Sequence, residues 1–371
     1  MTGATPSGAA ATEAPIQTDA LVIGAGPVGL FQVFQLGLQD IHAQVVDALP
    51  HVGGQCAELY PDKPIYDIPG LPLVSGEQLV DQLMQQAAPF KPGLHLGQQL
   101  SALAQTEDGR WQLQTSSDRR FIARIVFIAA GAGAFVPRSI KLDGIERHLG
   151  RQVLHALPDA GALAGQRVLV LGDEELALQA AIALARGGAL APASVSLVHR
   201  RDSFRASDAT VAELQALRDS GALQFIAGQA LALVCDAVCD ANGSGAITAL
   251  ELATPDGQTR TVPMDRMLVL MGLSPRLGPI ADWGFDLQRR QVPVDAERFQ
   301  TALPGVFAVG DINTYPGKKK LLLCGFHEAT LAAFAAAAIL RPGQQGPLQY
   351  TTTSSRLHRL LGVSPGGPSK R

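Results

Sequence analysis

The sequence predicts an α/β protein with two parallel-sheet domains, the second of which is inserted into the first. A buried strand, a glycine-rich turn and a helix follow one another near the N-terminus, and the same order returns after Gln166. A third strand, from Thr301 to Val309, ends in a Gly-Asp turn and precedes an apolar helix. These units are typical of doubly wound, Rossmann-like folds, and 371 residues are enough for two of them.

Composition restricts the classes of function. The chain has 47% hydrophobic and 17% charged residues with a formal net charge of -3, so we expect no nucleic-acid partner. Residues 1–15 lack the basic start and apolar centre of a signal peptide and are predicted to be a disordered tail, and residues 362–371 a loose tail. The apolar run from Ala329 to Leu340 is shorter than the roughly 20 residues that span a bilayer. We therefore expect no membrane partner and a cytoplasmic location.

The four cysteines contain no C-x-x-C pair. Cys235 and Cys239 are separated by three residues, while Cys56 and Cys324 stand alone. A zinc site or a redox-active dithiol requires closely spaced cysteine pairs. We therefore expect free thiols in a reducing cytosol and no metal site.

The first glycine-rich turn has the spacing of a dinucleotide site. The strand from Asp19 to Ile23 runs directly into Gly24, Gly26 and Gly29, with Pro27 inside the turn. Gly24 permits the tight turn, Gly26 lets the backbone approach a pyrophosphate, and Gly29 allows close packing of helix on strand. The N-terminus of the following helix would then face the diphosphate.

Asp47 strengthens this interpretation. It ends a second strand about 20 residues after the turn, where an acid binds the ribose diol of a dinucleotide. The alternative is a glycine-rich turn without a ligand.

Two further segments indicate which dinucleotide this is. The strand that ends at Gly310 and Asp311 resembles the second FAD motif of flavoproteins with two dinucleotide-binding domains. That resemblance implies that Asp311 hydrogen-bonds the ribityl or phosphate region of FAD. The strand from Ile125 to Ala130, followed by Gly131 and Gly133, resembles the segment that closes such an FAD domain. Together these elements favour FAD over a nicotinamide cofactor in the first domain.

The second strand–turn–helix unit carries the basic residues of an NADP site. The strand from Ser194 to Val198 is followed by His199 and by Arg200, Arg201 and Arg205, where an NAD site would carry an acid. Guanidinium groups suit a 2′-phosphate because they present paired donors and permanent charge. The alternative interpretation is a solvated basic turn.

The glycine-rich loop of this second unit departs from the usual G-x-G-x-x-A pattern. Gly172 is present, but Glu174 replaces the central glycine, and Asp173 and Glu175 add further negative charge. Acids here would repel a pyrophosphate. Either the loop is displaced so that its carboxylates point to solvent and NADP(H) binds weakly, or the domain has lost its nucleotide.

The chain from about Thr18 to Val363 resembles the ferredoxin/flavodoxin–NADP reductases of thioredoxin-reductase type. The segments that carry this resemblance are residues 53–70, 130–138, 272–280, 310–320, 325–329 and 350–355. Thioredoxin reductases themselves carry a C-x-x-C in the NADP domain, whereas this chain has no cysteine between Gly172 and Gly187. Disulfide reduction is therefore not expected.

The resemblance implies a homodimer in which FAD transfers electrons between NADPH and ferredoxin or flavodoxin. It assigns residues 16–134 and 297–361 to the FAD domain and residues 135–296 to the NADP-like domain. Tyr60 would stack on one flavin face, unless it is an ordinary half-buried aromatic residue. A C-terminal segment, often from the partner subunit, would cover the other face. Further residues assigned to FAD binding are Gly54, Gln55, Asp67, Tyr350 and Thr352.

Hydride transfer to flavin needs no catalytic side-chain set, and none is predicted. The basic run from Lys318 to Lys320 either attracts an acidic ferredoxin or is an ordinary solvated loop. The acidic loop keeps a second hypothesis open, in which the chain is a flavin-binding redox sensor or accepts electrons from a donor other than NADPH.

Overall fold

The computed structural model describes residues 14–159, 161–236, 245–343 and 350–363, and the structural statements below concern these residues. The chain forms two compact units, which are described separately. Unit 1 contains residues 1–134 and 276–371, and unit 2 contains residues 135–275. The predicted tails fall largely outside the described residues, and the first strand begins at Ile16.

Unit 1 is built on a mixed seven-stranded sheet. Its strands lie in the order β5-β2-β1-β8-β7-β6, and β20 pairs with β8 as well. All pairs among β5, β2, β1, β8 and β20 are parallel, whereas β6 and β7 are antiparallel to their neighbours. The strands are β1 (Ile16–Ile23), β2 (Ala43–Val46), β5 (Gly93–His95), β6 (Leu100–Gln105), β7 (Trp111–Thr115), β8 (Arg120–Ile128) and β20 (Val306–Ala308).

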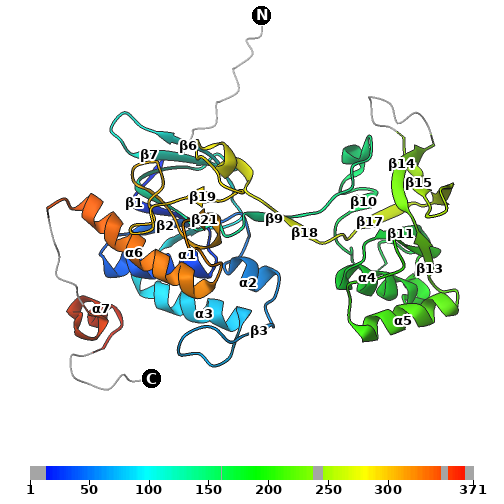
Figure 1. The fold of residues 1–371 in the computed structure, drawn as a ribbon, viewed down its shortest axis with the longest axis horizontal. Helices are drawn as coiled ribbons and strands as arrows, with labels where there is room; N and C mark the ends of the chain where they lie inside the picture. The colour runs from blue at the N-terminus through cyan, green and yellow to red at the C-terminus, as the bar shows by residue number, and fades with distance from the viewer. Residues whose placement is uncertain (1–13, 160, 237–244, 344–349, 364–371) are drawn as a thin grey trace, which may run out of the picture. The chain divides into compact units, whose positions relative to one another are not determined.

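Both faces of this sheet are buried, which explains the uninterrupted apolar sequence of its central strands. Ala20 and Val22 of β1 pack on one side with residues of α1, α3 and α6, whereas Leu21 and Ile23 pack on the other side with Trp283. Figure 1 shows the three helices together beneath the sheet. The helices of unit 1 are α1 (Pro27–Leu38), α2 (Gly54–Glu58), α3 (Gly76–Ala87), α6 (Leu322–Leu340) and α7 (Ser355–Leu360).

Helix α6 is longer than the predicted apolar run. It begins at Leu322 and has 19 residues, so the expectation of a run too short to span a bilayer is wrong: by length and composition alone α6 could cross a membrane. One face of α6 carries buried Gly325, Glu328 and Ala329 and continues with three buried alanines. The alanines Ala332, Ala333 and Ala336 pack in the same core as α1, as in a core helix.

Short elements complete unit 1. The two-stranded pairs β3–β4 and β19–β21 are antiparallel and parallel, respectively. Their bounds are β3 (Pro64–Ile65), β4 (Val74–Ser75), β19 (Val292–Pro293) and β21 (Asn313–Thr314), and the 3-10 helices of this unit are η1 (Ala88–Phe90), η4 (Gly278–Asp282), η5 (Gly310–Ile312) and η6 (Thr351–Thr353).

Unit 2 contains a five-stranded parallel sheet and a three-stranded antiparallel sheet. The parallel sheet has the order β10-β17-β11-β12-β13, with α4 and α5 packed on one face and the antiparallel sheet on the other. Its elements are β10 (Val153–Leu154), β11 (Arg167–Leu171), α4 (Glu175–Ala185), β12 (Ser194–His199), α5 (Asp208–Asp219), β13 (Gln224–Ala227), β14 (Gln229–Cys235), β15 (Ile247–Ala253), β16 (Thr259–Pro263) and β17 (Arg266–Val269), with the 3-10 helices η2 (Ile145–His148) and η3 (Gly188–Leu190).

The chain passes between the units twice, along β9 (Ala134–Pro137) and β18 (Leu273–Arg276), which pair with each other. The predicted return to the first domain near residue 296 is too late, because unit 1 resumes at Arg276. Ile280, Trp283 and Phe285 pack against strands of the seven-stranded sheet, which places this segment in unit 1. This long-range packing leaves no local signal in the sequence.

The cysteine prediction is correct for two of the thiols and wrong for a third. Cys56 and Cys324 are free. Cys235, at the end of β14, is disulfide-bonded, so the expectation of free thiols fails there. Cys239 lies outside the described residues. Among the described residues no cluster of His, Cys, Asp and Glu could hold a metal ion.

Candidate functional site

The turn between β1 and α1 leaves no room for side chains. Gly24 has φ +107°, and a Cβ built on it would lie 2.5 Å from the carbonyl oxygen of Ala129. A Cβ on Gly29 would lie 1.9 Å from the Gly24 oxygen, so glycine is required at both positions. Helix α1 starts at Pro27 after the N-cap residue Gly26, which offers no capping side chain. The backbone N–H groups of its first turn are therefore available to an anion.

Asp47 lies directly beside this turn. One carboxylate oxygen accepts a hydrogen bond from the Ala25 N–H at 2.6 Å, and the other accepts from the Leu49 N–H at 2.8 Å. Burial raises the pKa of Asp47 despite these two donors, which act in the opposite direction. The two bonds fix the orientation of the carboxylate relative to the glycine turn.

Two further glycine turns meet the start of α1. The Gly53 N–H donates to the Ala25 oxygen at 2.8 Å, and a Cβ on Gly54 would lie 3.1 Å from the Cα of Gly26. Gln55 reaches the turn after β8, since its Nε2 would lie 3.0 Å from a Cβ on Gly131. Glycine turns that are far apart in the sequence therefore lie around the start of α1.

The Gly310–Asp311 turn closes the same region. The Val309 N–H donates a hydrogen bond to the Ile128 carbonyl oxygen, and a Cβ on Gly310 would lie 3.4 Å from the side chain of Val28 in α1. The carboxylate of Asp311 makes no hydrogen bond within the described part of the chain. Its negative charge contributes to the raised pKa of Tyr60, about 12, although burial and the neighbouring Cys56 contribute more. Tyr60 and Asp311 therefore lie within electrostatic reach of each other.

A buried ion pair holds the Gly310–Asp311 turn in place, and the sequence analysis did not predict it. Glu328 of α6 is fully buried, and one of its oxygens accepts from the Gly310 N–H at 2.7 Å and from Asn313 at 2.9 Å. Its other oxygen accepts from Tyr315 at 2.9 Å and from Lys318 Nζ at 2.5 Å. Lys318 also donates to the Gly310 carbonyl oxygen at 2.9 Å. Both polar backbone groups of Gly310 are therefore held by one charged pair.

This pair corrects the interpretation of the lysine run. The side chain of Lys318 is only 7% exposed and cannot act as a steering charge, whereas Lys319 and Lys320 are exposed. A single acid in an otherwise apolar helix was the signal that could have indicated Glu328, because an isolated buried carboxylate requires a partner. The sequence does not identify that partner.

Asp67 is exposed, and its side chain makes no hydrogen bond among the described residues, so its assignment to FAD stays a prediction. Two other predicted residues lie away from this region. Tyr350 is 67% exposed and Thr352 lies in the exposed turn η6. The adjacent α7 contacts the C-terminal end of α1, where Arg356 donates a hydrogen bond to the Gly37 oxygen and forms an ion pair with Asp40. Figure 1 accordingly shows α7 well separated from α2.

The second glycine turn, in unit 2, connects β11 to α4. A Cβ on Gly172 would lie 2.2 Å from the Leu270 oxygen and 2.6 Å from the Cβ of Ala177, so this position is also restricted to glycine. Glu174 is the N-cap residue of α4, but its side chain does not cap the helix. The main-chain geometry of a nucleotide turn is thus retained with an acid at the helix start.

The carboxylates of this loop do not all point to solvent, so the prediction of a solvent-directed loop is wrong. Asp173 is 17% exposed and binds the fork of Arg205 through both oxygens, at 2.8 Å each. Glu174 contacts the same guanidinium at 3.0 Å. Arg205 lowers the pKa of Asp173, and the pKa of Arg205 is raised in turn, chiefly by Asp173. Glu175 accepts from the Ser207 N–H at 2.7 Å and from Thr210 at 2.5 Å.

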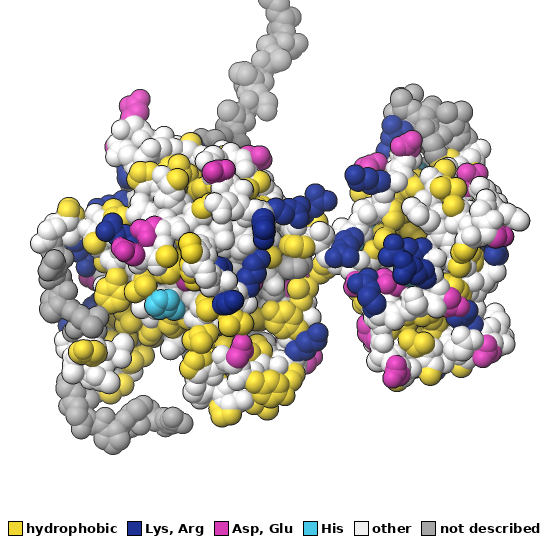
Figure 2. Space-filling view, in the orientation of Figure 1, with side chains coloured by type: hydrophobic (Ala, Val, Ile, Leu, Met, Phe, Trp, Pro, Cys, Tyr) yellow, Lys and Arg dark blue, Asp and Glu magenta, His cyan; other side chains and the backbone are white. Residues whose placement is uncertain are grey.

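Of the three predicted arginines, Arg200 and Arg201 differ from Arg205. Both follow β12 directly, are exposed and form no ion pair within the described residues. Figure 2 shows Lys and Arg side chains gathered on the visible face of unit 2. An anion can therefore reach these two guanidinium groups without displacing another side chain.

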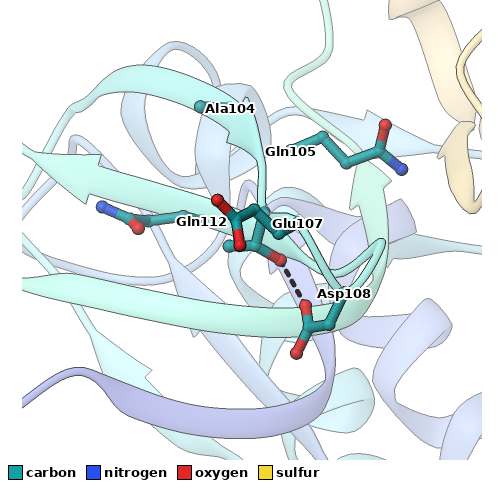
Figure 3. A pocket seen from close by; sticks show the side chains of 6 residues that line it. Ala104, Gln105, Glu107, Asp108 and Gln112 are labelled. Carbon is teal, nitrogen blue, oxygen red and sulfur yellow. Dashed lines mark hydrogen bonds between the residues drawn. The ribbon is translucent and has the colours of Figure 1, made fainter.

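A shallow hollow of about 570 Å³ lies at the hairpin between β6 and β7 in unit 1, lined by Gln105, Glu107 and Asp108 among others (Figure 3). The dashed line in Figure 3 is the bond from Thr106 to Asp108 at 2.5 Å. None of the predicted cofactor residues lines this hollow. It is open to solvent and gives no indication of a chemical role.

Comparison with known proteins gives the family. The sequence pattern of the pyridine nucleotide-disulphide oxidoreductases matches residues 18–330. The chain belongs to this family. A protein from Paracidovorax citrulli named ferredoxin–NADP reductase is 56% identical over 352 residues, covering 95% of this chain and 98% of the relative. A protein of the same name from Leptothrix cholodnii is 53% identical and covers 99% and 97%, respectively.

Two solved structures show the same fold. Thioredoxin reductase of T. acidophilum aligns with a TM-score of 0.55 and 20% identity, covering 87% of this chain and 99% of that structure. A bacillithiol disulfide reductase from Staphylococcus aureus aligns with a TM-score of 0.61 and 14% identity, covering 88% and 100%. The predicted α/β fold with two dinucleotide-type domains is confirmed by these matches and by the parallel sheets of both units.

Proposed function

We propose that this oxidoreductase is a ferredoxin–NADP reductase, which passes electrons between NADPH and ferredoxin or flavodoxin. The observation that carries the proposal is its likeness, over almost the whole chain, to relatives that have this name. Ferredoxin as the acceptor is inferred from those names, and flavodoxin from the sequence resemblance described above. The glycine turns of the two units supply the physical support.

The residues of unit 1 fit FAD. Gly24, Gly26 and Gly29 leave the backbone bare at the start of α1, where free N–H groups would bind the diphosphate. Asp47 is held in place to accept from a ribose hydroxyl. Asp311 has no hydrogen-bond partner among the residues that the structure describes, and it would accept from the ribityl chain or its neighbourhood. Bound FAD supplies the exchange between a two-electron hydride and single electrons.

The side chains around that position have separate roles. Tyr60 stays a neutral phenol over the physiological range, since burial raises its pKa to about 12, and would offer its ring to the flavin. Gln55 and Gly131 lie together beside the start of α1 and would limit how far the cofactor can enter the site. The N-terminus of α6 carries a positive dipole end that favours negative charge nearby.

The residues of unit 2 fit a nicotinamide dinucleotide with a 2′-phosphate. Gly172 leaves the turn after β11 without a side chain. Arg200 and Arg201 follow β12, where a 2′-phosphate would lie, and they have no ion-pair partner in the described part of the chain. Because Arg205 already binds two carboxylates, we propose weaker NADP(H) binding than a glycine loop would give.

We also propose that the chain acts as a cytoplasmic homodimer. Tyr350 and Thr352 are exposed and precede α7, which Arg356 binds to the end of α1 away from the glycine turns. This is expected of a segment that covers the flavin of a partner subunit. A second function remains open because of the acidic loop: a flavin-binding redox sensor, or an enzyme that takes electrons from a donor other than NADPH.

An anaerobic titration of the purified protein with NADPH and, separately, NADH tests the proposal. Rapid loss of flavin absorbance at micromolar NADPH is expected, followed by re-oxidation on addition of oxidised ferredoxin. Reduction by dithionite but by neither coenzyme would refute the reductase function and favour the sensor. A preparation without flavin absorbance would refute the FAD assignment as well.

A further inference from the structure

The acidic loop of unit 2 poses an electrostatic problem. Asp173, Glu174 and Glu175 lie at the start of α4, where a dinucleotide in this fold places its pyrophosphate. Uncompensated carboxylates there would repel the phosphates and cancel the attraction of the helix N-terminus. Any dinucleotide that binds this unit requires these charges to be neutralised by something nearby.

Arg205 is the residue placed to neutralise them. Its Nε and Nη2 bind the two oxygens of Asp173 at 2.8 Å, and Nη2 contacts Glu174 at 3.0 Å. The main chain adds to this hold, since the Arg205 N–H donates to the Asp173 carbonyl oxygen at 2.7 Å, and Glu174 and Arg205 form a parallel β-bridge. Both side chain and backbone therefore attach Arg205 to the loop.

We propose that Arg205 serves the acidic loop rather than the 2′-phosphate, and that Arg200 and Arg201 alone discriminate NADPH from NADH. This inference rests on the proposed function. Arg205 cancels part of the charge of Asp173 and Glu174, so that the pyrophosphate of either coenzyme can approach α4. Both coenzymes share the pyrophosphate and only one has the 2′-phosphate, so Arg205 acts on the binding of both alike.

Glu175 does not need the same compensation. Its oxygens accept from the Ser207 N–H, Thr210 and Gln179, so its charge is already directed at the start of α5. His199 is the other basic group close to Asp173, with its Nε2 3.8 Å from a carboxylate oxygen. Arg205 is thus the permanently charged group of the described chain that pairs with this loop.

The test compares Arg205→Ala and Arg201→Ala in the full-length, flavin-loaded protein. Dissociation constants for NADP⁺ and NAD⁺ are measured by calorimetry, and kcat/KM for NADPH and NADH by anaerobic flavin reduction. R205A should weaken both coenzymes by about twofold to fivefold, the range of a partly exposed ion pair, with their ratio unchanged. R201A should weaken NADPH by a similar factor and leave NADH unchanged.

A matched control and a compensating variant sharpen the result. Arg167 binds Asp265 with the same bidentate geometry at the opposite end of β11, so R167A should change the binding of neither coenzyme. In the double variant D173N/R205A, one acid and one base are removed together. Its affinities for both coenzymes should be higher than those of R205A and close to the original values.

Three outcomes would overturn the inference. Weaker binding of NADPH alone in R205A would make Arg205 a 2′-phosphate ligand. Unchanged binding of both coenzymes would remove the neutralising role. A double variant that does not recover would separate Arg205 from Asp173. In each case the unmodified protein is still reduced by NADPH, whereas failure of the proposed function appears as no reduction of the unmodified protein by either coenzyme.

Discussion

The turns after β1 and β11 have the same strand–glycine–helix order but opposite electrostatic character. The first turn has no acid between Gly24 and Gly29, and its nearest acid, Asp47, is held by two backbone N–H groups. The second turn carries three consecutive acids and depends on a partly exposed arginine. The first region is therefore preorganised by its backbone, while the second is balanced by side-chain charge.

The ion pairs of the two units differ in the same way. Glu328 and Lys318 are almost completely buried beneath the Gly310–Asp311 turn. Asp173 and Arg205 pair at the surface, where solvent screens the interaction. Removing one partner should thus be far more damaging in unit 1 than in unit 2.

Glu328→Ala is the variant with the largest expected effect. Loss of the carboxylate leaves Lys318 charged and buried and removes the partner of the Gly310 N–H, which should destabilise unit 1 by about 3–5 kcal/mol. Both tryptophans, Trp111 and Trp283, lie in unit 1, so urea unfolding followed by tryptophan fluorescence reports this unit specifically.

The matched control is Asp173→Ala in unit 2. Its midpoint of thermal unfolding, followed by circular dichroism, should move by no more than about 3 °C. If E328A were as stable as the unmodified protein and retained its flavin, the buried pair would not be the support of the Gly310 turn.

The glycine positions give the next comparison, between Gly29 and its counterpart Ala177. A methyl group on Gly29 would lie 1.9 Å from a backbone oxygen, so G29A should cost about 3 kcal/mol and reduce flavin content. Ala177 is fully buried, and A177G should cost only about 1 kcal/mol through the lower helix propensity of glycine. Equal losses in the two variants, measured by urea unfolding and circular dichroism, would contradict a tighter turn in unit 1.

The pH dependence should separate the regions as well. The folded-state pKa of Tyr60 is raised to about 12, so the stability that its neutral form contributes is complete below pH 10 and is lost as pH rises toward 12. After allowance for partial exposure, this loss is roughly 1–2 kcal/mol. Unit 1 of a Tyr60→Phe variant should therefore lose less stability between pH 9 and 11.5, as measured by tryptophan fluorescence in urea.

The pKa of Asp173 is lowered rather than raised, so its effect on stability appears at acid pH. Arg205 lowers its folded-state pKa, so the stability that the ionised form contributes is complete above its ordinary pKa and is lost as pH falls through the lowered value. Asp173→Asn should remove that acid-side dependence without changing the alkaline side. An unchanged acid limb in D173N would show that the pair is not formed in solution.

The sequence predicted those parts of the site that depend on local backbone geometry. Gly24, Gly29 and Gly310 could be recognised because each takes a backbone position or close contact that other residues cannot adopt, and the structure brings their turns together. Asp47 was recognised for a similar reason, since the end of a parallel strand fixes its place beside the first turn.

The parts that depend on distant partners could not be predicted. Lys318 was read as a member of an exposed basic run, because nothing near it in the sequence indicates the buried Glu328. Arg205 was grouped with Arg200 and Arg201, although its guanidinium turns to an acid 32 positions earlier. The return to unit 1 at Arg276 likewise depends on the packing of Trp283, which no local pattern reveals.

The smallest expected effect comes from making the second turn more like the first. Glu174→Gly removes one carboxylate and the side chain at the N-cap of α4, while Asp173 still holds Arg205. Affinity for NADP⁺ and NAD⁺ should rise together by about threefold, because the relieved repulsion acts on the pyrophosphate that both share. Calorimetry on E174G and on E174Q separates charge from bulk: E174Q should recover most of the gain if repulsion dominates, and little of it if the side chain obstructs the turn. A gain for NADP⁺ alone would instead mean that the loop acts on the 2′-phosphate.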